Sequence, residues 1–194
     1  MEESTLDWKE AQKLATRITN GESSAYLESI EETNPFSDIS VLGSLLSFAI
    51  TDSSTIEVVL RVNDDDAIPS EIKSQLKSGK LSAKKMPKAV FYELYQDYIC
   101  SCSLRVARET FALLPVDMVI VNAIGKILNT KTGYIEEQPI LSVAIPGQTL
   151  ETLSLDTIDP SDSMGNFVHN MNFKKTSGFR AVEKIDPSLL KPVG

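Results

Sequence analysis

Apolar residues near the start of the chain recur at helical spacing. One stripe runs from Leu6 to Ile18 and stops at Asn20-Gly21, a pair that commonly ends helices. A second, shorter stripe follows and stops at Asn34-Pro35. The pattern predicts an N-terminal helical segment over residues 1–34. We expect it to form one folded unit with the domain over residues 35–194.

Further along, two pairs of apolar, β-branched segments are separated by turn residues. The first pair is 45–50 and 55–62, and the second is 118–121 and 140–145, with a turn at 129–133. Each pair predicts a β-hairpin. In the first hairpin, alternation predicts a set of side chains on the core side of the sheet: Ile56, Val58, Leu60 and Val62.

The longest helical pattern, 89–114, lies between the two hairpins, and Pro115 ends it. Shorter helices are predicted near 149–153 and 164–171, and the lysine-rich stretch 73–88 is predicted to be an exposed loop. The order of elements predicts an α+β fold. Its antiparallel or mixed sheet is built from the two hairpins and covered by the long helix.

Composition and charge narrow the function classes. The chain has 42% hydrophobic residues, a formal net charge of −8 and no apolar run of the roughly 20 residues that span a bilayer. The first residues are acidic, unlike a secretory signal. We therefore expect a cytoplasmic protein without a membrane partner. The negative charge makes nucleic acid an unfavourable partner and, among proteins, gives only a mild preference for basic ones. We expect a protein partner, and a homo-oligomer stays open.

The two cysteines, Cys100 and Cys102, form a C-x-C within the predicted long helix. Residues two apart on a helix point to different sides, so these thiols are not placed to share a metal ion. His169, the single histidine, could in principle activate a cysteine or a serine. We expect the cysteines to fill the core and His169 to be a partly buried hydrogen-bonding residue.

Several short motifs carry a resemblance to a known family. They are Asp7-Trp8, Asn34-Pro35-Phe36, Tyr92 to Tyr98, Leu104 to Glu109, Leu128-Asn129-Thr130, Gly133, Glu136 to Val143, Ile158 to Met164, and Phe173 to Thr176. Together they resemble an uncharacterised bacterial family described only as a domain of unknown function, over most of the chain. The resemblance implies a bacterial, cytoplasmic protein in which this region can follow another domain. It implies no activity.

A metal-dependent phosphodiesterase or nuclease is the alternative function. Its carboxylates would be Asp117 before one strand and Glu136 and Glu137 on the paired strand, with Glu109 assisting from the helix. A divalent cation would be the cofactor in that case, and otherwise none is expected. Gln138 stands where such enzymes usually have a lysine. Acidic residues at the ends of hairpins are also commonly just solvated.

Two basic features are candidate binding sites. Lys84 and Lys85 belong to the lysine-rich stretch, which lacks interleaved aromatic residues for stacking bases. Arg105 and Arg108 lie on adjacent turns of the long helix and could bind an anion if both faced one cavity. No convergent catalytic set emerges from the sequence. The leading hypothesis is therefore a non-enzymatic interaction or regulatory module that acts through protein contacts.

Overall fold

A computed structural model describes residues 2–37, 39, 45–63 and 67–190, with side chains from residue 8 onward. The helices are α1 (Glu2–Thr19), α2 (Ser23–Thr33), α4 (Lys88–Leu113), α5 (Gly147–Glu151) and α6 (Pro160–Ser163), with 3₁₀ turns η2 (Met164–Asn166) and η3 (Pro187–Leu189). The strands are β1 (Leu45–Ile50), β2 (Thr55–Arg61), β3 (Glu71–Gln75), β4 (Leu81–Lys85), β5 (Met118–Leu128), β6 (Ile135–Pro146), β7 (Val168–Lys174) and β8 (Gly178–Arg180).

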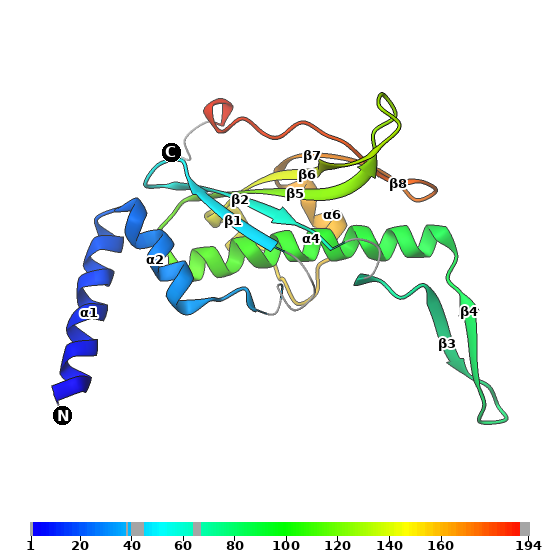
Figure 1. The fold of residues 1–194 in the computed structure, drawn as a ribbon, viewed down its shortest axis with the longest axis horizontal. Helices are drawn as coiled ribbons and strands as arrows, with labels where there is room; N and C mark the ends of the chain where they lie inside the picture. The colour runs from blue at the N-terminus through cyan, green and yellow to red at the C-terminus, as the bar shows by residue number, and fades with distance from the viewer. Residues whose placement is uncertain (1, 38, 40–44, 64–66, 191–194) are drawn as a thin grey trace.

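The predicted α+β fold is confirmed, and its main sheet is mixed. Six strands lie in the order β1-β2-β5-β6-β7-β8, while β3 and β4 form a separate hairpin. The pairing of β2 with β5 is parallel and every other pairing in the main sheet is antiparallel. The parallel pair arises because α4 returns the chain across the sheet between β2 and β5, as a crossover must. Figure 1 shows α4 running beneath the sheet.

The core lies between α4 and one face of the sheet. The four side chains predicted to face it from the first hairpin are all buried, with exposed fractions of 0% for Ile56, Val58 and Leu60 and 8% for Val62. On β5, Val119, Val121 and Ala123 are fully buried, but so are Ile120 and Asn122 between them. The alternating sequence pattern therefore fixes the face that packs on the helix for β2 and not for β5.

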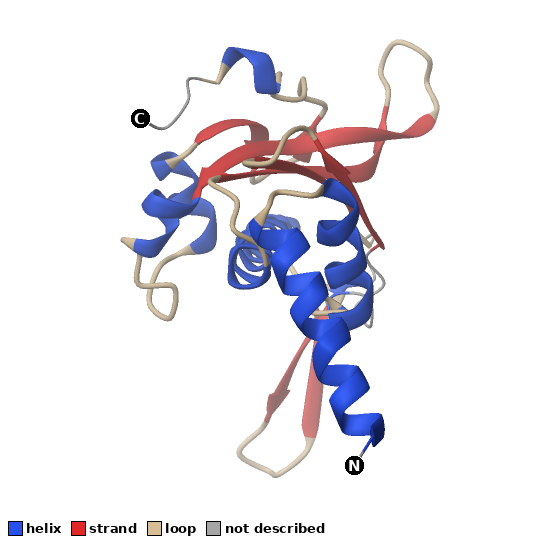
Figure 2. Ribbon diagram, turned by 90° about the vertical axis from the view of Figure 1, so that its left-hand side faces the viewer, coloured by secondary structure: helices blue, strands red, loops and turns tan. Residues whose placement is uncertain are grey.

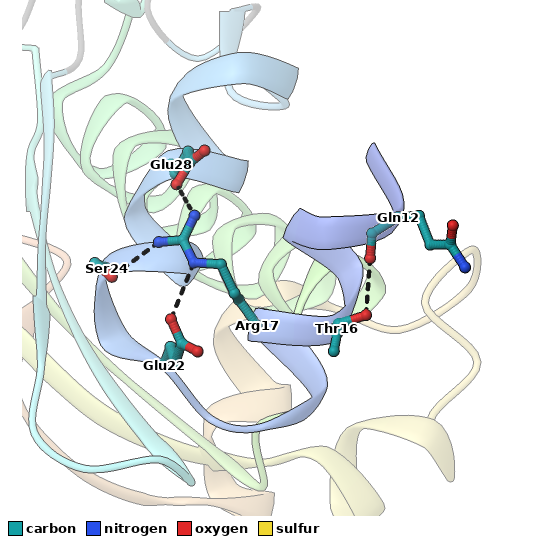
Figure 3. A network of polar contacts seen from close by, with 6 residues as sticks. All are labelled: Gln12, Thr16, Arg17, Glu22, Ser24 and Glu28. Atoms are coloured by element: carbon teal, nitrogen blue, oxygen red, sulfur yellow. Dashed lines mark hydrogen bonds and ion pairs between the residues drawn. The ribbon is translucent and has the colours of Figure 1, made fainter. Parts of the chain in front are cut away.

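The two N-terminal helices join the core through α2. Tyr26 is only 1% exposed and its hydroxyl donates a hydrogen bond to the Ser53 carbonyl in the β1–β2 turn. Arg17, near the end of α1, donates to Glu22, Ser24 and Glu28 and so ties α1 to α2 (Figure 3). The N-terminal part of α1 extends away from the rest of the molecule (Figure 1).

The second face of the sheet is crossed by the segment 181–190, the red stretch above the strands in Figure 1. A chain of hydrogen bonds connects this segment to the sheet. The Ile185 amide donates to Ser142 Oγ, the Ser142 hydroxyl donates to Asn122 Oδ1, and the Asn122 amide group donates to Glu57 Oε1. Asn122 and Ser142 are fully buried, so these bonds satisfy polar groups that water does not reach.

Two expectations about local structure are wrong. Residues 164–171 form the turn η2 and the start of strand β7, not a helix. The segment pairs with β6, and this tertiary pairing overrides a helical pattern only two turns long. The stretch 73–88 is not a loop, because most of it forms β3, β4 and the first residue of α4.

Candidate functional site

The β3–β4 hairpin, residues 71–85, is here called the basic arm. It is held by a regular antiparallel register and a short turn, in which the Leu76 amide donates to the Lys80 carbonyl. Gly79 has a φ of 81°, the left-handed conformation that such three-residue turns require. Ser78-Gly79 was a turn signal in the sequence, but the residues on either side alternate too weakly to indicate two strands.

The basic arm projects away from the main sheet (Figure 2). Nine of its ten strand residues are exposed, and Ser82 is the exception. Isolated two-stranded hairpins are marginally stable in water, since neither face is covered by a core. Three apolar side chains add to the exposed surface: Ile72 at 44%, Leu76 at 51% and Leu81 at 77%.

The charge of the arm is opposite to that of the chain as a whole. Residues 71–85 contain five lysines and one acidic residue, Glu71, in a chain of net charge −8. Lys85 pairs with Glu71 and Lys84 pairs with Ile72 across the hairpin. Because neighbouring residues of a strand point to opposite faces, Lys84 and Lys85 lie on different faces of the arm. The arm is therefore basic on both sides.

The structure places Arg105, Arg108 and Glu109 at one cavity. All three line a cavity of about 350 Å³ between α4 and the segment that leads into α6, where Leu155, Ile158 and Pro160, the first residue of α6, form the opposite wall. The two arginines are exposed and Glu109 is half-buried.

A second and larger cavity, of about 720 Å³, adjoins the first and shares Arg108 and Leu155 with it. It lies at the C-terminal end of α4, against α5 and the loop that follows. Its charged lining is mostly acidic, with Asp117, Glu151 and Asp156 against the single cation Arg108. We call the two adjoining cavities the α4 cleft. The sequence did not indicate it, because its walls come from segments some 40 residues apart.

The four carboxylates of the metal-enzyme alternative do not form one site. Asp117 immediately precedes β5, where Met118 pairs with Pro146, whereas Glu136 pairs with Ile127 near the far end of the same ladder. At about 3.3 Å per residue, the two ends are roughly 30 Å apart. Across the residues that the structure describes, no group of three or more histidine, cysteine, aspartate or glutamate side chains could hold a metal ion.

Glu136 and Glu137 have local partners instead. Asn129 and Thr132 in the β5–β6 turn donate hydrogen bonds to Glu136, and these bonds lower the pKa of its carboxyl group. Glu137 forms an ion pair with Arg61 at 3.4 Å. Both carboxylates thus have partners at this end of the sheet. Of the four, only Glu109 and Asp117 line the α4 cleft.

The cysteines and His169 do not form a nucleophilic pair. Cys100 and Cys102 are both free and buried on α4. His169 lies on β7, where its Nδ1 is 3.1 Å from the Phe167 carbonyl. Burial raises the pKa of the Cys100 thiol to about 12, with further contributions from Asp97 and Asp159, and burial also raises the pKa of Cys102. Thiols with raised pKa values are poor nucleophiles at neutral pH.

We expect both native thiols to react with a disulfide reagent at pH 8 at least about 100-fold more slowly than in urea, because the reaction requires opening of the core. The pH dependence of stability has a definite sign. The folded-state pKa of Cys100 is raised from 9.0 to about 12, so its contribution is complete below pH 9 and is lost as pH rises toward 12. Thiol labelling of the native and the urea-unfolded protein, with Cys100→Ala to separate the two sites, checks the expected difference in rate. Equal labelling rates in the two states would contradict that expectation.

Within the described residues, no helix is both long and apolar enough to cross a membrane. Comparison with protein-family models, curated proteins and solved structures found no match to this chain.

Proposed function

We propose that the protein is a non-enzymatic interaction module and that its basic arm binds an acidic surface of a partner protein. The single observation that carries this is the projection of a lysine-rich, two-stranded arm, exposed along its length, from an otherwise acidic molecule. Positive and negative surfaces attract at a distance and orient the encounter of two proteins. Ordering of a marginally stable hairpin against a partner would also give it the cover that it lacks.

The chemistry of the arm favours a protein over a nucleic acid. Apolar residues Ile72, Leu76 and Leu81 are interleaved with the lysines, and these suit an apolar spot surrounded by carboxylates. No arginine and no aromatic residue stands in 71–85, although arginine reads guanine and aromatic rings stack on bases. The net charge of −8 opposes approach to a phosphate backbone.

Trp8, on α1 and not on the arm, supports the interaction-module part of the proposal independently. It belongs to the apolar stripe of α1, and its side chain is 65% exposed, while Leu14 and Ile18 farther along the stripe are half-buried. The Leu6 side chain, at the start of that stripe, lies outside the described residues. Exposed tryptophan is enriched among the residues that dominate protein interfaces.

We also propose that the chain is related to the uncharacterised bacterial family and that it is cytoplasmic. The short motifs quoted in the sequence analysis support the relationship to the family. Two unpaired, buried thiols and the lack of a disulfide support a reducing compartment.

The proposal predicts a charge-dependent contact at the tip of the arm. With a photo-crosslinking residue in place of Leu81, in cells that naturally produce the protein, we expect a protein adduct. Reversal of Lys73, Lys77, Lys80 and Lys84 to glutamate should reduce the adduct at least tenfold, since each exposed ion pair contributes about 0.2–1 kcal/mol and repulsion adds to the loss.

A matched control carries the same change of charge outside the arm, at Lys9, Lys13, Lys131 and Lys174. This control should retain the adduct, and circular dichroism should show both variants folded. An adduct that is absent from the wild type, unchanged by reversal of the arm, or removed by nuclease would overturn the proposal. The last outcome would indicate a nucleic acid as the partner.

A further inference from the structure

The α4 cleft is elongated along the C-terminal half of its helix. Its lining along α4 begins at Ser101 and ends at Leu114, the residue that caps the helix. A rise of about 1.5 Å per residue over this span gives a length of about 20 Å. That length matches about six residues of extended chain at roughly 3.3 Å each.

The two cavities of the cleft have opposite net charge. The smaller one is lined by Arg105, Arg108 and the acid Glu109, and Arg108 belongs to both. The larger one carries the three carboxylates of Asp117, Glu151 and Asp156. None of these three carboxylates forms an ion pair with another described residue.

The helix itself strengthens this polarity. α4 has 26 residues and no basic residue in its last turn, and its C-terminal end, at Ala112 and Leu114, lines the acidic cavity. The C-terminus of a helix carries roughly half a negative charge and attracts cations within its last turn. The acidic end of the cleft is therefore suited to a cationic group.

Apolar side chains line both cavities beside the charged groups. Leu155 belongs to both cavities, and Phe111, Leu150 and Leu153 continue the apolar lining. Gly147 permits this arrangement, since a Cβ there would come within 3.2 Å of the Phe111 ring. Apolar lining with few charged groups at fixed positions is typical of binding sites.

We propose that the α4 cleft binds an extended segment of about six residues from a partner protein. The segment would place an acidic side chain at the Arg105–Arg108 end, apolar side chains over Leu155 and a basic side chain among the three carboxylates. This rests on the proposed function in taking the partner to be a protein, but it uses a surface separate from the basic arm. The length and the opposed charges fit such a segment better than a compact small molecule.

The test uses fluorescein-labelled hexapeptides and the intact chain, followed by fluorescence anisotropy. The probes are ELSLSK and its reversed order KSLSLE, with ELSLSE and KLSLSK as uniformly charged controls. We expect one of the two dipolar peptides to bind at least tenfold more tightly than either control. Both ELSLSK and KSLSLE are needed, because the direction of the bound segment is known only once it is clear which of the two peptides binds more tightly.

Variants place the interaction in the cleft. The pair Arg105→Glu with Arg108→Glu, and separately Glu151→Lys with Asp156→Lys, should each weaken the preferred peptide at least tenfold. Combining all four substitutions inverts the polarity of the cleft, so the reversed peptide should then become the tighter binder. Lys131→Glu, at an exposed turn residue far along the chain, should leave the affinity unchanged.

Equal affinity for all four peptides, no binding at millimolar concentration, or competition by free lysine or glutamate as effective as by peptide would overturn the proposal. The arm-reversed variant separates this proposal from the proposed function. If the arm-reversed variant binds the hexapeptide normally while the wild type forms no Leu81 adduct, the arm contact fails and the cleft stands. If the wild type forms an arm-dependent Leu81 adduct while no dipolar peptide binds preferentially, the cleft alone is rejected.

Discussion

Replacement of Tyr26 by alanine is expected to lower the free energy of unfolding by about 3–5 kcal/mol, the range for removing a large buried aromatic side chain. Tyr26 is 1% exposed and is one of the largest fully buried side chains. It joins α2 to the core and to the β1–β2 turn at once. The alanine variant would leave a cavity there and a Ser53 carbonyl without its donor.

The size of the effect reports whether the N-terminal helices belong to the cooperative unit. Tyr26→Phe is the matched control, because it keeps the ring and removes only the hydroxyl, which should cost about 1 kcal/mol. Urea unfolding followed by circular dichroism measures both variants. Amide hydrogen exchange should show loss of protection in α4 and the sheet as well as in α2. Loss confined to residues 2–33 would instead mean that the helices unfold separately.

Gly178→Ala is the second substitution with a large expected effect, at about 2–5 kcal/mol. Gly178 has a φ of 74°, and an alanine Cβ would lie 2.9 Å from Tyr92 Cε1 and 3.0 Å from its Cδ1. The left-handed backbone costs a residue with a Cβ about 1–2 kcal/mol, and forced contacts in a packed site add typically 1–3 kcal/mol. The turn from β7 to β8 would be displaced from the first part of α4.

Gly133→Ala isolates the backbone contribution. Its φ is 77°, and a Cβ there would meet nothing within 4 Å, so only the left-handed conformation is penalised. We expect it to cost about 1–2 kcal/mol. In a double-mutant cycle, Gly178→Ala made in a Tyr92→Ala background should cost nearly as little free energy of unfolding as Gly133→Ala. Equal costs at Gly178 and Gly133 would show that the Tyr92 ring moves aside freely.

Part of the basis for the proposed functions could be predicted from the sequence, and part came only from the structure. The lysines of the stretch 73–88 were evident from the sequence. That this stretch forms a projecting hairpin was not evident, because its residues alternate only weakly and nothing packs on either face. Arg105, Arg108 and Glu109 could be grouped from helical spacing alone. The acidic half of the α4 cleft required residues 147–156 to be placed against the end of α4, which no local pattern specifies.

The sequence by itself determined the strongly periodic elements: the N-terminal helices, the long helix, the two hairpins and the core face of β2, since Ile56, Val58 and Leu60 alternate without interruption. Local patterns determine such elements because each residue reports which of its sides is apolar. Only the tertiary structure decided the parallel pairing of β2 with β5, the strand at 168–174 and the separation of Asp117 from Glu136 along one ladder. These depend on which distant segments meet, and the free energy that selects them comes from contacts made only after the chain has folded.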